Sequence, residues 1–448
     1  MTKATRLIEG EGDLLQYFVD GETEPAQWMV GTEHEKIGLL ADSLERIPYE
    51  GERGIGVLLE RIASRDSWER VFEGENVIAL EKDGASITLE PGGQLELSGA
   101  PLRTTRETCA EFNAHVDLLK DISADMGVLW LGIGHDPLHT VDEIPRMPKA
   151  RYDIMRNYLP TRGGLALHMM HATATVQANF DYASEADMVA KFRTAMAVTP
   201  IVTAMFANSS FSLGKENGFA SRRADIWRDT DPDRCGMLEF IFERDFGYRD
   251  YLEWALDVPM FFIVRDHRYI DATRLTFRQF MAEGLDGERA TMGDFDSHLT
   301  TLFPEVRLKH IIEVRGADAA SRELICALPA VWKGILYDPD GLEAAAALVA
   351  GVSSSERHEG LVDISRRGLS AQYAGRGALE WARELLDISA RGLRAIENRG
   401  ETAPGETAFL DPLFEIVERG RSPGEELVAR FRSEWNGSIE RLIESAKY

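Results

Sequence analysis

Two glutamates near the amino terminus have the spacing that divalent-cation chemistry requires. Glu33 and Glu35 lie two residues apart in segment 31–38, whose pattern predicts a β-strand. Side chains alternate between the two faces of a strand, so both carboxylates must point the same way. Adjacent carboxylates repel each other, and a hard cation that prefers oxygen ligands relieves the repulsion. The pair therefore predicts a site for Mg²⁺ or Mn²⁺.

Three further predicted strands, over 87–98, 174–181 and 310–315, also present one polar face each. A solvated face is the ordinary interpretation of any one such strand. Glutamates, however, predominate on three of the four segments, where a solvated face usually has mixed charge. We interpret the four strands as one ligand-binding face, where magnesium would bind with the phosphates of ATP. Its polar members beyond the first pair are Glu90, Gln94, Glu96, Ser98, Thr175, Gln177, Asn179, Asp181, Glu313 and Arg315.

The other segments predict an α+β fold with an antiparallel sheet. Apolar periodicity predicts long helices over 103–126 and 184–208, and mainly helical structure from about residue 340 to 448. Helices and strands do not alternate as a doubly wound parallel fold requires. We expect a single domain over 1–448 whose C-terminal part, 340–448, is helical.

Arginines in two irregular segments are candidates for binding anionic substrates. Arg151 lies in segment 147–158, and Arg228 and Arg234 lie in segment 227–236. Arginine forks bind carboxylates and phosphates in a bidentate way. Salt bridges that only stabilise the loops are an equally good explanation of these residues.

Composition limits the partners and the location. The formal charge of −25 argues against nucleic acid or an anionic membrane surface as a partner. No secretory signal is recognisable, and the three cysteines form no CxxC pair, so we expect a cytoplasmic protein without a structural zinc site. The chain has no GxxxxGK[ST] and no GxSxG motif, which argues against a P-loop and a serine hydrolase. We expect small-molecule substrates and a monomer or homodimer.

Several strings, in order over about residues 25–340, resemble the plant-type glutamate–cysteine ligase family. They include GTEHEKIG (31–38), ITLEPGGQLELSGAPL (87–102), MPKARYDIMRNYLP (147–160), TVQANFD (175–181), WRDTDPDR (227–234) and FPEVRLKHIIEVRGAD (303–318). The resemblance implies a glutamine-synthetase-like fold, in which a curved antiparallel sheet forms a funnel for ATP, metal ions and glutamate. It also implies a two-step reaction. ATP phosphorylates the γ-carboxylate of glutamate, and the amine of cysteine then displaces phosphate, the first step of glutathione synthesis.

The resemblance further implies roles for individual residues. Arg234 would hold glutamate, with Arg228, Arg151, Thr175 and Asn179 on the substrate side, and Arg315 and Lys36 would face the phosphates. The implied metal ligands are Glu33, Glu35, Glu90, Glu96, Gln177 and Glu313.

Two features leave alternatives open. Ala172 stands where the family has an arginine, before TVQ, so a γ-glutamyl ligase with another amine acceptor is an alternative, as is a non-catalytic ligand sensor. On strand alternation, His171 and Ala172 would face opposite ways. Cys109 and Cys326 match a regulatory cysteine pair of the plant enzymes, although for this chain we favour two buried thiols.

Overall fold

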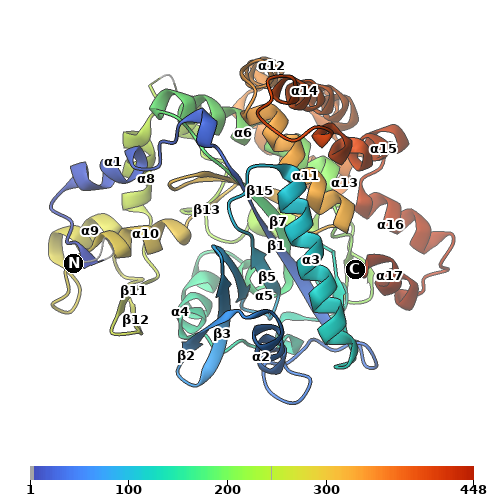
Figure 1. Ribbon diagram of the computed structural model, residues 1–448, viewed down its shortest axis with the longest axis horizontal. Coiled ribbons are helices and arrows are strands. Elements are labelled where there is room, and N and C mark those ends of the chain that lie inside the picture. Colours follow the sequence, from blue (N-terminus) through green and yellow to red (C-terminus); the bar gives the residue numbers. More distant parts are fainter. Residues whose placement is uncertain (1–4, 244) are drawn as a thin grey trace.

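A nine-stranded sheet organises the fold, and β1 lies near its centre (Figure 1). The computed structural model describes residues 5–243 and 245–448. The sheet order is β14-β15-β7-β1-β5-β4-β3-β2, and β6 also pairs with β1. All neighbouring strands of this sheet pair antiparallel, which confirms the predicted α+β class with an antiparallel sheet. The strands are β1 Val30–Leu40, β2 Glu69–Glu73, β3 Asn76–Lys82, β4 Ala85–Leu89, β5 Leu95–Ser98, β6 Val128–Leu131, β7 Thr175–Phe180, β14 Val306–Leu308 and β15 Ile312–Asp318.

Helices surround the sheet. They are α1 Glu11–Val19, α2 Ile55–Asp66, α3 Thr105–Ala124, α4 Ala150–Tyr158, α5 Ala166–Ala172, α6 Glu185–Phe206, α7 Arg222–Trp227, α8 Tyr248–Asp257, α9 Phe277–Glu283, α10 Met292–Thr300, α11 Arg322–Leu336, α12 Pro339–Val349, α13 Ser354–Arg367, α14 Ala378–Asn398, α15 Asp411–Arg419, α16 Pro423–Arg432 and α17 Ile439–Ala446. Short strand pairs complete the structure: β8 Phe211–Ser212 with β9 Lys215–Glu216, β10 Cys235–Gly236 with β13 Phe303–Pro304, β11 Phe262–Arg265 with β12 Arg268–Asp271, and β16 Gln372–Tyr373 with β17 Arg376–Gly377.

The two long helices predicted from periodicity are present. Helix α3 begins with a capping box between Thr104 and Glu107, which satisfies backbone N–H groups at its first turn. Helix α6 is almost wholly buried, with Ser184 accepting a hydrogen bond at its start. By length and composition α6 could cross a membrane, but 83% of its apolar window is buried inside the protein, as expected of a core helix.

The reverse face of the sheet packs against helices. Val176, Ala178 and Phe180 of β7 share a core with α6 and α11, and Leu95 and Leu97 of β5 share a second core with α2 and α3. The alternating polar residues of the same strands are thereby directed to the opposite face. In Figure 1, α3 runs beside the central strands, and α12, α14 and α15 lie near one another in the upper part of the view.

A disulfide joins α3 to α11. Cys109 and Cys326 are bonded, with their Cα atoms 5.1 Å apart and a sequence separation of 217 residues. The expectation of two separate buried thiols was therefore wrong. Their pairing brings together helices that the sequence pattern could not place side by side.

Removing this bond should lower stability, because a cross-link between distant residues restricts the unfolded chain. We expect Cys326→Ala to reduce the free energy of unfolding of the oxidised protein by about 2–5 kcal/mol. Urea unfolding of the two proteins, with and without reductant, measures this. The difference should vanish under reducing conditions, and a difference that persists there would point to lost packing instead.

Candidate active site

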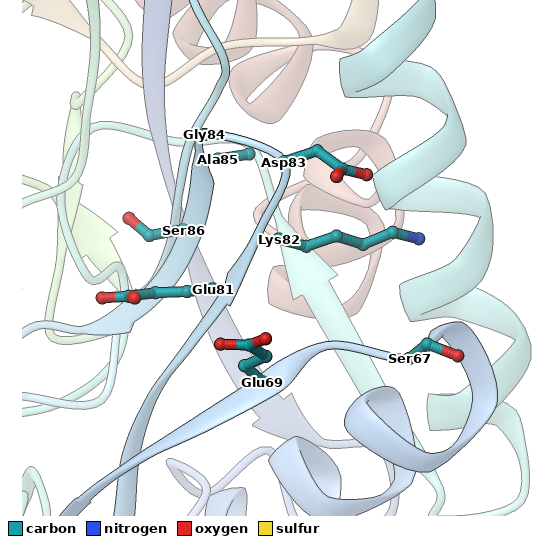
Figure 2. Close-up of a pocket in the computed structure, with 8 residues that line it drawn as sticks. All are labelled: Ser67, Glu69, Glu81, Lys82, Asp83, Gly84, Ala85 and Ser86. Carbon is teal, nitrogen blue, oxygen red and sulfur yellow. The ribbon is translucent and has the colours of Figure 1, made fainter.

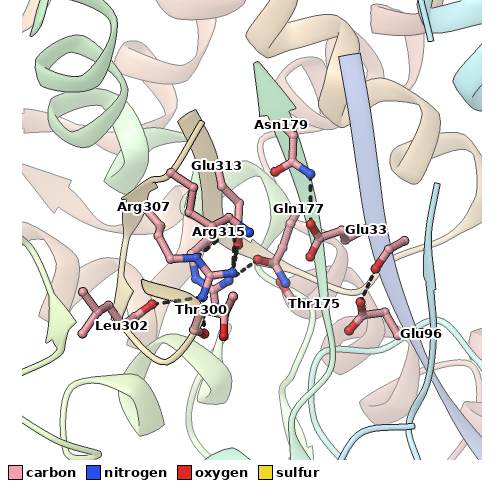
Figure 3. A network of polar contacts seen from close by, with 12 residues as sticks. Glu33, Glu96, Thr175, Gln177, Asn179, Thr300, Leu302, Arg307, Glu313 and Arg315 are labelled. Carbon is pink, nitrogen blue, oxygen red and sulfur yellow. Dashed lines mark hydrogen bonds and ion pairs between the residues drawn. The ribbon is translucent and has the colours of Figure 1, made fainter. Parts of the chain in front are cut away.

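The strand register brings the predicted polar residues into one continuous face. Glu35 lies opposite Glu96 across the β1–β5 pair, and Glu33 lies opposite Gln177 across the β1–β7 pair. Glu313 lies opposite Asn179 across the β7–β15 pair. Directly opposed residues of an antiparallel sheet project from the same side. Figure 3 shows Glu33, Glu96, Gln177, Asn179 and Glu313 gathered on that side.

One carboxylate of the face is held by cations. Arg307 donates to both oxygens of Glu313, with Nε–Oε2 3.0 Å and Nη2–Oε1 2.8 Å, and Lys309 lies 3.4 Å from Oε2. Arg315 bridges Glu313 and the Gln177 side-chain oxygen (Figure 3). Burial opposes ionisation of Glu313, but these three cations outweigh it and hold its pKa below the ordinary value.

The other carboxylates lack such neutralisation. Burial, followed by the charges of Glu313 and Glu96, raises the pKa of Glu33 to about 7. Burial and the nearby Glu90 raise the pKa values of Glu35 and Glu96 as well. Hydrogen bonds from Asn179 Nδ2 to Glu33 (2.9 Å) and from the Thr175 backbone N–H to Glu35 (3.1 Å) orient the first pair. The face therefore holds more negative charge than its own residues balance.

The donor atoms of the face suit a hard cation. They are carboxylate and amide oxygens, and Asn179 Oδ1 is buried with no hydrogen-bond partner among the described residues. Within residues 5–243 and 245–448, no three His, Cys, Asp or Glu side chains are grouped closely enough to hold an ion as they stand. Two contacts help to explain this: Glu313 is turned toward Arg307, and Glu96 accepts from Ser98.

A glycine turn positions Glu90 beside the face. Gly93 has a φ of +77°, and a Cβ on Gly92 would lie 2.2 Å from the His171 carbonyl oxygen, so both positions favour glycine. The turn closes with hydrogen bonds from Gly93 N to Glu90 O and from Glu90 N to Gln94 O. Arg151 is close enough to interact electrostatically with Glu90. One predicted arginine therefore lies at this end of the face.

Three basic residues that the sequence analysis did not select also belong to this region. Arg307 is opposite Glu313 across the β14–β15 hairpin, and this cross-strand pairing could have been inferred from the spacing in VRLKHIIEVR. Lys149 is buried and donates to Leu89 O at 2.9 Å; burial lowers its pKa to about 7, against the opposing charges of Glu90 and Glu96. Arg223 of α7 is buried and donates to Arg315 O at 2.9 Å.

Arg223 is supported by a buried polar cluster around Asp318. The Asp318 carboxylate accepts hydrogen bonds from Asn208 N (2.8 Å), Ser209 Oγ (2.6 Å) and Ser221 Oγ (2.8 Å). Burial lowers the pKa of Arg223, and Asp318, Glu305 and Glu35 counteract that effect. The string FANSSF thus joins the end of α6 to β15 and to the start of α7. No local signal in the sequence indicates that Arg223 approaches Glu35.

Comparisons with known proteins show the family of this chain. The model of glutamate–cysteine ligase family 2 matches residues 29–445. This chain belongs to that family. Chloroplastic glutamate–cysteine ligases of Brassica juncea and Arabidopsis thaliana are each 45% identical to it over 439 residues, which cover 97% of this chain and 84% and 82% of theirs. A glutamate–cysteine ligase from Francisella tularensis, solved in complex with AMP, has a TM-score of 0.57 at 11% identity and covers 94% of this chain and 87% of its own; it shows the shared fold.

The relatives correct the predicted location. The plant members of glutamate–cysteine ligase family 2 that match this chain are named as chloroplastic proteins, which points to a plastid and contradicts a cytoplasmic location. Cysteine content and the lack of a recognisable secretory signal were therefore insufficient grounds for that prediction.

The position of Lys36 contradicts its predicted role of facing the phosphates. Lys36 follows Glu35 in β1, so its side chain projects from the opposite face of the sheet. There its Nζ contacts His34 Nδ1 at 3.0 Å and lies 6.0 Å from the centre of the Phe112 ring. The sheet separates it from any phosphate bound among the carboxylates.

The guanidinium group of Arg234 is not free to bind a substrate either. Its Nε donates to Asp231 Oδ2 at 2.7 Å, Nη1 to Thr301 O at 3.2 Å and Nη2 to Pro259 O at 2.8 Å. The side chain is fully buried under the Phe261 ring. The structure thus contradicts the substrate-holding role, and the loop-stabilising interpretation applies to Arg234.

Two other sequence predictions in this region are also revised. Arg228 ends α7 and contacts Asp225 at 3.4 Å, an ion pair within a single helix turn. His171 and Ala172 belong to helix α5, so alternation between strand faces does not describe them. Both are buried, and the Ala172 carbonyl accepts a hydrogen bond from Asp136 N at 2.7 Å.

A cavity at the edge of the sheet extends the polar face outward. The cavity has a volume of about 560 Å³ and is lined by Ser67, the β3–β4 turn and residues of β2, β3 and β4 (Figure 2). Glu69 pairs with Glu81, Glu81 with Ser86, and Ser86 with Ser98, in direct line with Glu33. The exposed glutamates of the edge make useful comparison positions for those at the centre.

The buried pair of Arg307 with Glu313 should contribute strongly to stability. Arg307→Met would remove the bidentate partner of this buried carboxylate and leave only Lys309 and Arg315 beside it, and we expect the free energy of unfolding to fall by about 3–5 kcal/mol. Urea unfolding measures the change. Arg274→Ala is the control, because its pair with Asp286 is exposed (67% and 66%) and such pairs contribute about 1 kcal/mol or less. Equal losses in the two variants would contradict the importance of the buried pair.

Proposed function

We propose that this protein is an ATP-dependent ligase that joins the γ-carboxylate of glutamate to the amine of cysteine. One observation supports it above the others: a member of glutamate–cysteine ligase family 2 holds Glu33, Glu35 and Glu96 together against their mutual repulsion. A chain selected for stability alone has no need of that arrangement. Arg315 and Arg223 border the same carboxylates, so the face offers sites for both cations and anions.

The residues of the face would act by position and charge. ATP transfers its γ-phosphoryl group to the glutamate γ-carboxylate, giving γ-glutamyl phosphate and ADP, and the amine of cysteine then attacks the acyl carbon and releases phosphate. Arg315 is suited to stabilise negative charge on the phosphoryl group, since its guanidinium is held in place by Glu313 and Gln177. No covalent bond to a protein side chain is required, so orientation of the two substrates supplies much of the rate.

The proposed cofactor is Mg²⁺, with Mn²⁺ as a substitute. Glu33, Glu35, Glu90, Glu96, Gln177 and Glu313 would hold it through oxygen atoms. When bound, it would neutralise the phosphate oxygens of ATP. The arginines of the face would stabilise the negative charge that develops as the acyl carbon reacts.

Two arginines have roles in this proposal on the substrate side. Arg223, whose Nε–H has no hydrogen-bond partner among the described residues, would pair with a substrate carboxylate. Arg151 occupies the Glu90 end of the same face.

Thr175 has a structural role instead. Its hydroxyl donates a hydrogen bond to the Ala317 carbonyl at 2.8 Å and so positions β7 against β15.

Cysteine should be the preferred acceptor. ADP release in the presence of glutamate and ATP should rise when cysteine is added, and chelation with EDTA should abolish it until Mg²⁺ is restored. A panel of other amines at equal concentration tests the alternative raised by Ala172. If another amine stimulates release and cysteine does not, the ligase is one with a different acceptor. Binding of ATP without any turnover would favour the sensor.

Glutamates at the centre of the face should be needed for turnover. Glu33→Gln and Glu96→Gln should each reduce the rate by about a hundredfold or more, because each loses one anionic donor at the proposed metal and phosphate site. The steady-state rate of ADP formation measures this.

Two matched variants control for position and face. Glu81→Gln changes the same residue type on the same side at the exposed edge, and Lys36→Met alters β1 on the reverse side. We expect both to retain activity. Loss of activity in Lys36→Met, with an unchanged melting temperature, would mean that the catalytic region extends through the sheet.

A further inference from the structure

A second cleft lies on the reverse side of the sheet, away from the carboxylate face. Its volume is about 750 Å³, within the range of small-molecule sites. One wall is a single side of α3, where Ala110, Ala114 and Leu118 recur at helical spacing. The opposite wall is formed by β5 and the segment after it, including Leu97 and Leu102. Small side chains on α3 leave the space open.

Two residues that line this mostly apolar cleft each have a side-chain atom without a partner. Glu111 Oε1 accepts from Ala100 N at 3.0 Å, while Glu111 Oε2 is buried with no hydrogen-bond partner among the described residues. The same holds for Nε2 of His115, one helical turn further along α3, whose side chain is 94% buried. Buried polar atoms are normally bonded, so two such atoms on neighbouring turns point to a missing partner.

The positive charges around the cleft are already engaged. Lys82 Nζ is 2.9 Å from Asp66 Oδ1 and lies over the Trp68 ring, and Arg65 reaches Asp121 at 3.3 Å. Glu111, in contrast, pairs with no cation among the described residues, and burial raises its pKa. The unmet requirement of the cleft is therefore a donor, preferably a cationic one.

We propose that this cleft binds a small molecule with an apolar body and a protonated amine, the amine pairing with the Glu111 carboxylate and the body packing between α3 and β5. The bound molecule would touch Leu97, whose neighbours Glu96 and Ser98 face the other side of the sheet. This site is independent of the ligase chemistry proposed above, so binding alone tests it.

Isothermal titration calorimetry of the full chain with 2-phenylethylammonium tests the proposal. We expect one site per chain, no binding by Ala114→Trp, which fills the cleft, and binding at least about tenfold weaker by Glu111→Gln, which removes the charge but can still accept from Ala100 N. Ala114 is exposed, so the larger side chain does not disturb the core. Ala124→Trp, at the exposed end of α3, is the matched control and should bind as the unaltered protein does.

Neutral 2-phenylethanol, which has nearly the same shape, should bind more weakly than the amine. Absence of binding of the amine to the unaltered protein at millimolar concentration would overturn the proposal. So would equal affinity in Ala114→Trp, or equal affinity for the alcohol and the amine. Melting temperatures of the variants establish that each one is folded.

Discussion

Like-charge repulsion on one face of a sheet is the constraint on which this structure depends. Glu33, Glu35 and Glu96 are close enough for burial and mutual charge to raise their pKa values, and a fold at its lowest energy would separate them. Backbone pairing prevents this, because each glutamate occupies a ladder position that it cannot leave without breaking strand hydrogen bonds. Strain of this kind is characteristic of ligand sites.

Neighbouring cations determine which carboxylates of the face are already neutralised. Glu313 is satisfied by Arg307, Lys309 and Arg315, whereas the β1 and β5 glutamates are not. The face therefore has two halves, a neutralised half on β15 and an anionic half on β1 and β5. In the proposed reaction the anionic half would recruit metal ions, and the arginine half would meet the phosphoryl group and the substrate carboxylate. A chain with a formal charge of −25 thus has a local means of binding anionic substrates.

Period-two patterns were enough to predict the strands and the shared face. Glu33, Glu96, Gln177 and Glu313 come from four segments, and alternation in each of them is a local property. The same rule excludes Lys36 from the ligand face, because Lys36 directly follows Glu35. Only the family resemblance implied that Lys36 faces the phosphates. Arg223 and Arg234 show the limit of local reasoning. Which arginine is locked by neighbours and which reaches Glu35 depends on contacts between α7, β15 and the loops, and these contacts have no periodic signature.

The period of two in β1 also restricts how the gene can vary. Deletion or insertion of one codon within β1 would exchange the faces of the residues beyond it, moving His34 and Lys36 into the ligand face and glutamates against Phe112. Point substitutions in the strand can be graded in effect, but a change in its length cannot. Length variation among related genes is therefore expected in the surface connections, such as the β11–β12 turn, where positive φ angles at Asp266 and His267 mark a tight reversal far from the register of the central strands.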